Sequence, residues 1–310
     1  MPAHGLMLHH FHNDGNHIRS QGSISSDEFD RMLSLYAKNH TLLSAKEWLR
    51  KSARGELQEH DVCITFDDAL RCQFDLALPV LTSRNLTAFF FITTEHLNGT
   101  VPKLELYRYF RFKYFGDILD FYRAFDEASA DSPFTQKIAE GLKTYDPATF
   151  YREYAMYTPE DKRFRYIRDR ILVREEYETI MDLMLQARGV EKEKLLPLLW
   201  MNSECLVTLA EQGHLLGLHS HTHPTNMKML PKERQQSEYR TNKDILEKIA
   251  GKPITAMSHP EGSYNADTLA VLKELGIEVG FLAHMESPEN PGTLEYPRYN
   301  HCYLIPQIRE

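Results

Sequence analysis

A histidine-rich segment follows a short apolar run in the second half of the sequence. Leu215-Leu-Gly-Leu218 has the composition of a buried strand, and His219-Ser-His-Thr-His223 comes directly after it. Imidazole nitrogens bind divalent cations, and if one turn of helix follows the strand, His219 and His223 share a face at i and i+4. His221 would then point elsewhere. The alternative is an exposed polar loop, or histidines bonded to backbone carbonyls.

Two adjacent acids end a strong predicted strand in the first half. Val62-Cys-Ile-Thr-Phe66 is apolar and rich in β-branched residues, and Asp67 and Asp68 follow it. A cation held by two neutral nitrogens usually gains a carboxylate. Adjacent residues point in different directions, so one acid could bind the metal while its neighbour takes a proton from water. Taken alone, an Asp-Asp pair could equally be a solvated turn or a helix N-cap.

Two further groups could contribute to chemistry. The turn around Pro260 and Gly262 precedes a helix predicted to begin after Asn265, and such a turn presents backbone N–H groups that could hold an oxyanion. Turns that contain Pro and Gly are also common in loops that have no catalytic role. A second histidine cluster follows the first predicted strand and contains His9, His10, His12 and His17.

Strands and helices alternate on both sides of a helical stretch. A capping-box pattern at Ser25-Ser-Asp-Glu28 begins an amphipathic helix. Alternating strands and helices predict a parallel sheet, open or closed into a barrel, with the reactive side chains at the strand ends. The predicted strands cover residues 62–66, 88–92, 215–218, 254–257 and 277–283, and helices cover 231–250 and 266–275.

Residues 99–199 are predicted to be a helical insertion that acts as a lid or in substrate recognition. Residues 103–115 interleave Lys and Arg with Tyr and Phe. Rings stack on sugars and Arg holds phosphate, so this segment could recognise a phosphorylated or nucleotide-linked saccharide. The alternative is an amphipathic helix whose rings pack into the core of the insertion itself.

The composition excludes several classes of protein. The 310 residues carry 36 Lys and Arg against 44 Asp and Glu, a net charge of −8, which disfavours nucleic acid as the main partner. Four scattered cysteines predict neither a zinc ribbon nor a disulfide framework. The sequence has neither a signal-peptide pattern at its start nor an apolar run of about 18 residues, so we expect a cytoplasmic protein without a transmembrane segment.

Together these segments resemble the polysaccharide deacetylase superfamily, the NodB-homology fold of carbohydrate esterase family 4. Its first motif stands here as Thr65-Phe-Asp67-Asp68 and its second as His219-Ser-His-Thr-His223. The resemblance implies an α/β fold, a distorted (β/α) barrel of about seven strands built from residues 1–98 and 200–310. It also implies that Asp67 is the general base. The implied ligands of a divalent metal, usually zinc, are Asp68, His219 and His223.

The third motif of the family is present only in part. Glu261 stands where the family has Tyr, and Ser258 stands where it has Arg. The backbone N–H of Glu261 would share the oxyanion with the metal, and Arg298 would supply the missing cation. The resemblance also requires a histidine that protonates the leaving group, and we assign this role to His301.

The function implied is a metal-dependent hydrolase that removes an acetyl group from a sugar. The substrate would be a glycan precursor, nucleotide- or lipid-linked, for surface polysaccharide or lipopolysaccharide. One alternative is a deformylase or another amide hydrolase on the same metal site. Another is a catalytically inactive relative that binds a glycan.

Overall fold

The structure, a computed structural model, describes residues 1–151 and 157–309. The chain divides into two compact units, one formed by Met1–Pro102 and Leu196–Glu310 and the other by Lys103–Leu195. We call the first the barrel unit and the second the helical unit. Among the described residues, no helix combines the length and the apolar character needed to cross a bilayer.

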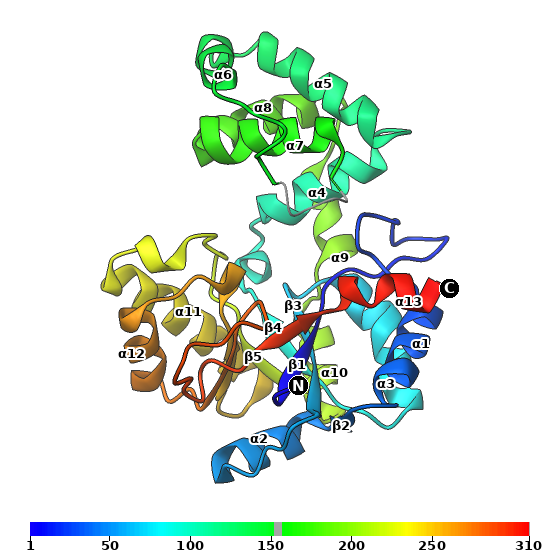
Figure 1. Cartoon of the computed structure of the whole chain (residues 1–310), viewed down its shortest axis with the longest axis vertical. Coiled ribbons are helices and arrows are strands. Elements are labelled where there is room, and N and C mark those ends of the chain that lie inside the picture. The colour runs from blue at the N-terminus through cyan, green and yellow to red at the C-terminus, as the bar shows by residue number, and fades with distance from the viewer. Residues whose placement is uncertain (152–156, 310) are drawn as a thin grey trace. The chain divides into compact units, whose positions relative to one another are not determined.

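Among the described residues, eight parallel strands form the sheet of the barrel unit. They are β1 (His4–Leu8), β2 (Thr41–Leu43), β3 (Asp61–Asp67), β4 (Phe89–Ile92), β5 (Leu215–Leu218), β6 (Ala256–Ser258), β7 (Val279–Phe281) and β8 (Arg298–Asn300). Seven follow one another in the order β7-β6-β5-β4-β3-β1-β8, and β2 pairs with the start of β3. Figure 1 shows β1, β3, β4 and β5 together in the middle of this unit. β3 is buried along its whole length, as its apolar sequence predicts.

The sheet curls until its two ends nearly meet. β8 pairs with β1, and the segment before β8 bonds to β7: the Tyr296 N–H donates to the Gly280 carbonyl at 2.9 Å, and the Leu282 N–H donates to the Tyr296 carbonyl at 2.8 Å. This approach requires glycine, because a Cβ at position 280 would lie 2.6 Å from the carbonyl oxygen of Leu294. The distorted barrel expected from the sequence is therefore confirmed.

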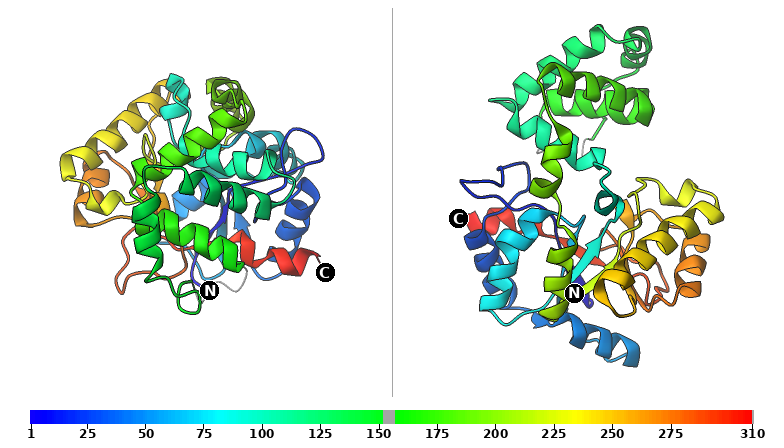
Figure 2. Two further views of the ribbon diagram at one scale, coloured as in Figure 1. Left: turned by 90° about the horizontal axis from the view of Figure 1, so that it is seen from above. Right: turned by 180° about the vertical axis from the view of Figure 1, so that it is seen from behind.

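Helices cover the outside of the barrel. They are α1 (Ser26–Tyr36), α2 (Ala45–Arg54), α3 (Leu78–Ser83), α9 (Leu196–Leu199), α10 (Ser203–Glu211), α11 (Lys232–Ala250), α12 (Ala266–Glu274) and α13 (Ile305–Arg309). α1 begins with the predicted capping box, since the Ser25 hydroxyl accepts from the Glu28 N–H and the Glu28 carboxylate accepts from the Ser25 N–H. In the rear view of Figure 2, α11 (yellow) and α12 (orange) lie together on one side, and α1 (blue) and α13 (red) on the other.

In its described residues, the helical unit contains helices and no strand. They are α4 (Lys103–Lys113), α5 (Ile118–Ala130), α6 (Thr135–Leu142), α7 (Pro159–Tyr166) and α8 (Arg174–Ala187). Aromatic rings form its core: Phe164 makes edge-to-face contacts with Phe121 and Phe125, at centroid distances of 5.2 and 4.9 Å. From the aromatic segment 103–115, Phe110 is fully buried, and the buried Tyr107 packs edge-on against Tyr177. These rings serve the core of the unit.

Candidate active site

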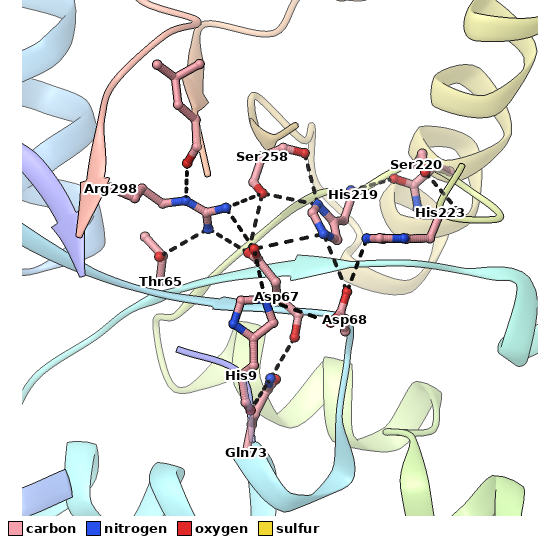
Figure 3. Close-up of polar contacts among 12 residues, drawn as sticks. His9, Thr65, Asp67, Asp68, Gln73, His219, Ser220, His223, Ser258 and Arg298 are labelled. Atoms are coloured by element: carbon pink, nitrogen blue, oxygen red, sulfur yellow. Dashed lines mark hydrogen bonds and ion pairs between the residues drawn. The ribbon is translucent and has the colours of Figure 1, made fainter. Parts of the chain in front are cut away.

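Asp67 and Asp68 lie at the carboxyl end of β3. Asp67 is the last residue of the strand and is 2% exposed, and Asp68 follows with a left-handed backbone (φ 77°). The turn at Asp68 aims the two carboxylates in different directions, as Figure 3 shows. Asp67 faces the guanidinium of Arg298, and Asp68 faces two histidines. The principal partner of Asp67 is therefore Arg298, and that of Asp68 is the histidine pair.

Arg298 holds Asp67 in a two-pronged ion pair. Its Nη1 and Nη2 donate to the two carboxylate oxygens at 2.7 and 2.8 Å, and both side chains are almost fully buried. Nη2 also donates to the Ser258 hydroxyl at 3.0 Å, and Nε donates to the Leu282 carbonyl at 2.5 Å. The side chain passes over Gly5 of β1, where a Cβ would lie 3.0 Å from Arg298 Cγ. A cation from β8 therefore lies beside the carboxylate of Asp67 and the hydroxyl of Ser258.

The surrounding charges keep both carboxylates ionised. Burial alone would raise the pKa of Asp67, but the positive charges of Arg298 and His219 outweigh it and lower the pKa. Burial also opposes the ionisation of Asp68, yet the hydrogen bond from His219 and the charge of His223 hold its pKa well below the usual range. Both acids are therefore acceptors, suited to taking a proton or a cation.

Residues 219–223, which we call the histidine loop, bring two imidazoles to Asp68. The ring centroids of His219 and His223 lie 4.9 Å apart. The helical turn considered from the sequence alone does not form, because the backbone is left-handed at Ser220 (φ 62°) and His223 (φ 53°). The two rings therefore converge without a helix.

Asp68, His219 and His223 form a group of ligand atoms that could hold a metal ion. The atoms lie within 4.8 Å of one another, and the Nε2 atoms of His219 and His223 lie 3.5 and 3.6 Å from Asp68 Oδ1. Zinc bonds of about 2.0–2.2 Å at tetrahedral angles place ligand atoms about 3.3–3.6 Å apart, so this spacing fits. The Nδ1–H of His219 donates to the Ser258 carbonyl at 3.0 Å, which leaves Nε2 free to bind. Three protein ligands leave a fourth position for water.

Burial and negative charge act in opposite directions on the two imidazoles. Burial disfavours the charged form of His219, but the carboxylates of Asp67 and Asp68 outweigh it and raise its pKa. At His223 burial dominates and lowers the pKa. A divalent cation would replace the proton on His219 and satisfy the same carboxylates.

His9 lies beside both carboxylates, a position that the sequence alone does not single out. Its Nε2 is 3.7 Å from Asp67 Oδ2 and 4.0 Å from Asp68 Oδ2, and its side chain is 27% exposed. The strand register explains this placement: Leu8 of β1 pairs with Phe66 of β3, so the next residue lies level with Asp67. The available signal is the histidine cluster directly after a predicted strand.

His301 has no ring nitrogen free for a substrate. Its Nδ1 and Nε2 lie 3.1 and 2.8 Å from the carbonyl oxygens of Met7 and Gly22, and burial lowers its pKa to about 4. The residue is 2% exposed. A general acid must reach the leaving atom through an available N–H, so this placement argues against the role predicted for His301.

Glu261 occupies a tight turn after β6. Its backbone is left-handed (φ 52°), as is that of Gly262 (φ 64°). The N–H groups of Gly262 and Ser263 each donate to a carbonyl three residues earlier. Within the part of the chain that the structure describes, the Glu261 N–H has no acceptor, which suits an oxyanion donor. Its exposed carboxylate lies close enough to His223 to raise the pKa of that ring against the effect of burial.

Known proteins resemble this chain in part of its sequence and in its fold. The family model described as polysaccharide deacetylase matches residues 121–280, more than half of the chain. The poly-beta-1,6-N-acetyl-D-glucosamine N-deacetylase of Staphylococcus epidermidis is 30% identical over 79 residues, 25% of this chain and 27% of that protein. The matched segment thus spans about a quarter of this curated relative.

Two solved structures have a similar fold. The deacetylase PplD of Streptococcus pyogenes, solved in complex with acetate, superposes with a TM-score of 0.55 at 16% identity, over 97% of this chain and 92% of that chain. IcaB of Ammonifex degensii superposes with a TM-score of 0.57 at 15% identity, over 99% and 95% of the two chains. At such identities the likeness concerns the fold.

Proposed function

Since this chain belongs to the polysaccharide deacetylase family, we propose that it is a metal-dependent hydrolase that removes acetyl groups from the amino sugars of a polysaccharide. The main support is one observation: three ligand atoms from Asp68, His219 and His223 meet beside the ion pair of Asp67 with Arg298. The relative named as an N-deacetylase of poly-beta-1,6-N-acetyl-D-glucosamine favours an acetyl group on nitrogen.

Asp67 is the general base of this proposal. Water attacks the acetyl carbon, and the carboxylate of Asp67 takes a proton from that water. Its low pKa keeps it ionised at neutral pH, and Arg298 fixes the direction in which it accepts. A divalent cation held by Asp68, His219 and His223, with zinc as the first ion to test, supplies Lewis-acid polarisation of the acyl oxygen. The Glu261 N–H would donate to the same oxygen.

His9 is the group that we assign to protonate the leaving amine, in place of His301. The bond between the acyl carbon and the sugar nitrogen breaks, acetate is released, and the nitrogen gains a proton. His9 is close to Asp67 and is partly exposed, so it can meet a substrate from the solvent side. Both properties are needed for proton return, and His301 lacks the second.

Acetate release from N-acetylglucosamine oligomers tests the proposal. The metal-loaded protein should release acetate, and Asp67→Asn should lower the rate by about 10²–10⁴-fold while the metal stays bound. Asp61→Asn is a matched control, because it removes a buried carboxylate at the other end of the same strand, where it pairs with Lys51. This control should keep most of the activity.

The same assay separates the alternatives. Release of formate from N-formyl substrates, without acetate, would identify a deformylase. Binding of the oligomers with a bound metal and no release of either acid would identify an inactive glycan-binding relative. Nucleotide-linked and lipid-linked acetyl sugars, compared with the polymer, would decide whether the substrate is a precursor of a surface glycan.

A further inference from the structure

The histidine loop requires outside support, because its own backbone is strained. Ser220 and His223 both have left-handed backbone angles, which side chains other than glycine disfavour. Within the loop, the His223 N–H donates to the Ser220 hydroxyl at 3.1 Å. Strain of this kind persists only where the surroundings fix the conformation.

Glu238 of α11 binds the middle of the loop. Its Oε2 accepts from the backbone N–H groups of His221 and Thr222, at 3.1 and 2.8 Å, and its Oε1 accepts from the Thr222 hydroxyl at 2.9 Å. Glu238 is 5% exposed. Hydrogen bonds to a buried charged group are about twice as strong as neutral ones. One carboxylate therefore holds both residues between Ser220 and His223.

Asn242 lies one turn further along α11, on the same face, and binds the start of the loop. Its Oδ1 accepts from the His219 N–H at 3.0 Å, and its Nδ2 donates to the Ile92 carbonyl at 2.9 Å and to the Thr94 hydroxyl at 3.1 Å. Asn242 is fully buried. It therefore ties the ends of β4 and β5 together at the point where His219 leaves the sheet.

His221 is also anchored to the segment that follows β4. The Nδ1 of His221 lies 2.9 Å from the Thr94 hydroxyl, and the His221 carbonyl accepts from the N–H groups of Thr94 and Glu95. His221 thus points toward the segment that follows β4. Every residue from 219 to 222 then has a contact that leads to α11, to β4 or to His223.

We infer that Glu238 and Asn242 are positioning residues for the metal site, because they set the separation and direction of His219 and His223. The inference rests on the proposed function, since it assumes that these histidines bind a metal. Groups that orient metal ligands from behind commonly contribute about 10- to 100-fold in metal affinity. Loss of either side chain should therefore weaken metal binding without removing any ligand.

The test measures Zn²⁺ and Co²⁺ affinity of the metal-stripped protein by competition with a chelator, together with the Co²⁺ absorption spectrum. Glu238→Ala should bind either ion about 10- to 100-fold more weakly, with a changed Co²⁺ spectrum. Glu238→Gln keeps an acceptor oxygen and should recover most of the affinity. Asn242→Asp, nearly identical in shape, replaces the donor that faces the Ile92 carbonyl and gives a second perturbation if Glu238→Ala fails to fold.

Gln235→Leu is the matched control. Gln235 is a fully buried amide on the same helix, and it bonds to the Leu230 carbonyl and to Thr268, away from the histidine loop. Its replacement should lower the free energy of unfolding of the metal-free protein and leave metal affinity unchanged. If Glu238 only stabilises the fold, Glu238→Ala should likewise lower the free energy of unfolding and leave metal affinity unchanged.

The outcomes separate the inference from the proposed function. If the wild-type protein binds metal and Glu238→Ala and Asn242→Asp bind it equally well, the inference is overturned and the proposed function stands. If the wild-type protein binds no metal, or Asp68→Ala binds as tightly as the wild type, the proposed function fails and the inference fails with it. If Glu238→Ala and Asn242→Asp bind the metal more weakly and Gln235→Leu binds it as tightly as the wild type, the result supports both the inference and the proposed function.

Discussion

Replacing Arg298 by methionine removes the cation beside Asp67 and keeps most of the length of the side chain. Two unit charges about 4 Å apart attract each other by about 4 kcal/mol at an effective dielectric constant of about 20. Because about 1.4 kcal/mol corresponds to a factor of ten, the proton affinity of Asp67 should rise by up to about 10³-fold. A protonated carboxylate accepts no proton from water, so turnover of the variant should fall most at mildly acidic pH, where more of its Asp67 carries a proton than in the wild type.

The direction of the pH effect follows from the pKa of Asp67. Burial raises this pKa and the Arg298 charge lowers it, so removing the charge shifts the pKa upward. The reaction needs the ionised carboxylate, and the acidic limb of the kcat/KM profile should therefore move to higher pH in Arg298→Met. The activity of Arg298→Met should recover in part at alkaline pH. The acidic limb of the profile of Arg298→Lys should lie between those of Arg298→Met and the wild type.

The assay is acetate release across pH, with metal content and unfolding measured on the same samples. Removing one partner of a buried ion pair costs about 3–5 kcal/mol of stability, so folding must be verified by denaturant titration. Arg165→Met is the control, because it breaks a largely buried Arg–Asp pair in the helical unit. The reasoning is refuted if folded, metal-loaded Arg298→Met keeps the pH profile of the wild type.

Further outcomes can be measured with the same preparations. His9→Gln should lower kcat by about 10²-fold or more with little change in KM, as expected for a lost general acid. Gly5→Val should displace the Arg298 side chain and reduce turnover while metal content is unchanged, since a Cβ at that position already lies 3.0 Å from Arg298 Cγ. Excess Zn²⁺ should raise the melting temperature of the wild type and leave that of Asp68→Ala unchanged. His96 is buried with its pKa lowered to about 4, so its contribution to stability is complete above pH about 6.5 and is lost as pH falls toward 4, by up to about 3 kcal/mol. Denaturant titrations at pH 7.5 and 5 should show a smaller acid loss in His96→Gln.

The sequence predicts the central part of the site because strand ends in a parallel sheet share one edge. The runs before Asp67 and His219 have the composition of buried strands, and β3 and β5 lie on either side of β4 in the structure. Asp68 and the two histidines therefore meet although about 150 residues separate them in the chain. The capping box at Ser25 is equally local, and the structure confirms it.

The remaining features depend on tertiary contacts that no local pattern encodes. His9 becomes a candidate for the general acid only through the register of β1 on β3. His301 is a poor candidate for this role because two backbone carbonyls face its ring nitrogens. The conformation of the histidine loop depends on α11, which begins nine residues after His223. The aromatic segment of the insertion allows two interpretations in sequence, and the burial of Phe110 favours a core role.

The two ends of the sheet meet between β7 and the segment before β8, and we call this junction the seam of the barrel. Its position has a consequence for how the molecule loses its activity. The residues that would hold the cation follow β3 and β5, which lie in the interior of the sheet order, whereas Arg298 belongs to β8, the last strand of that order. Fraying of the seam would withdraw the guanidinium and leave the ion in its place. Under mild denaturation or limited proteolysis between β7 and β8, catalysis should therefore disappear before the ion dissociates.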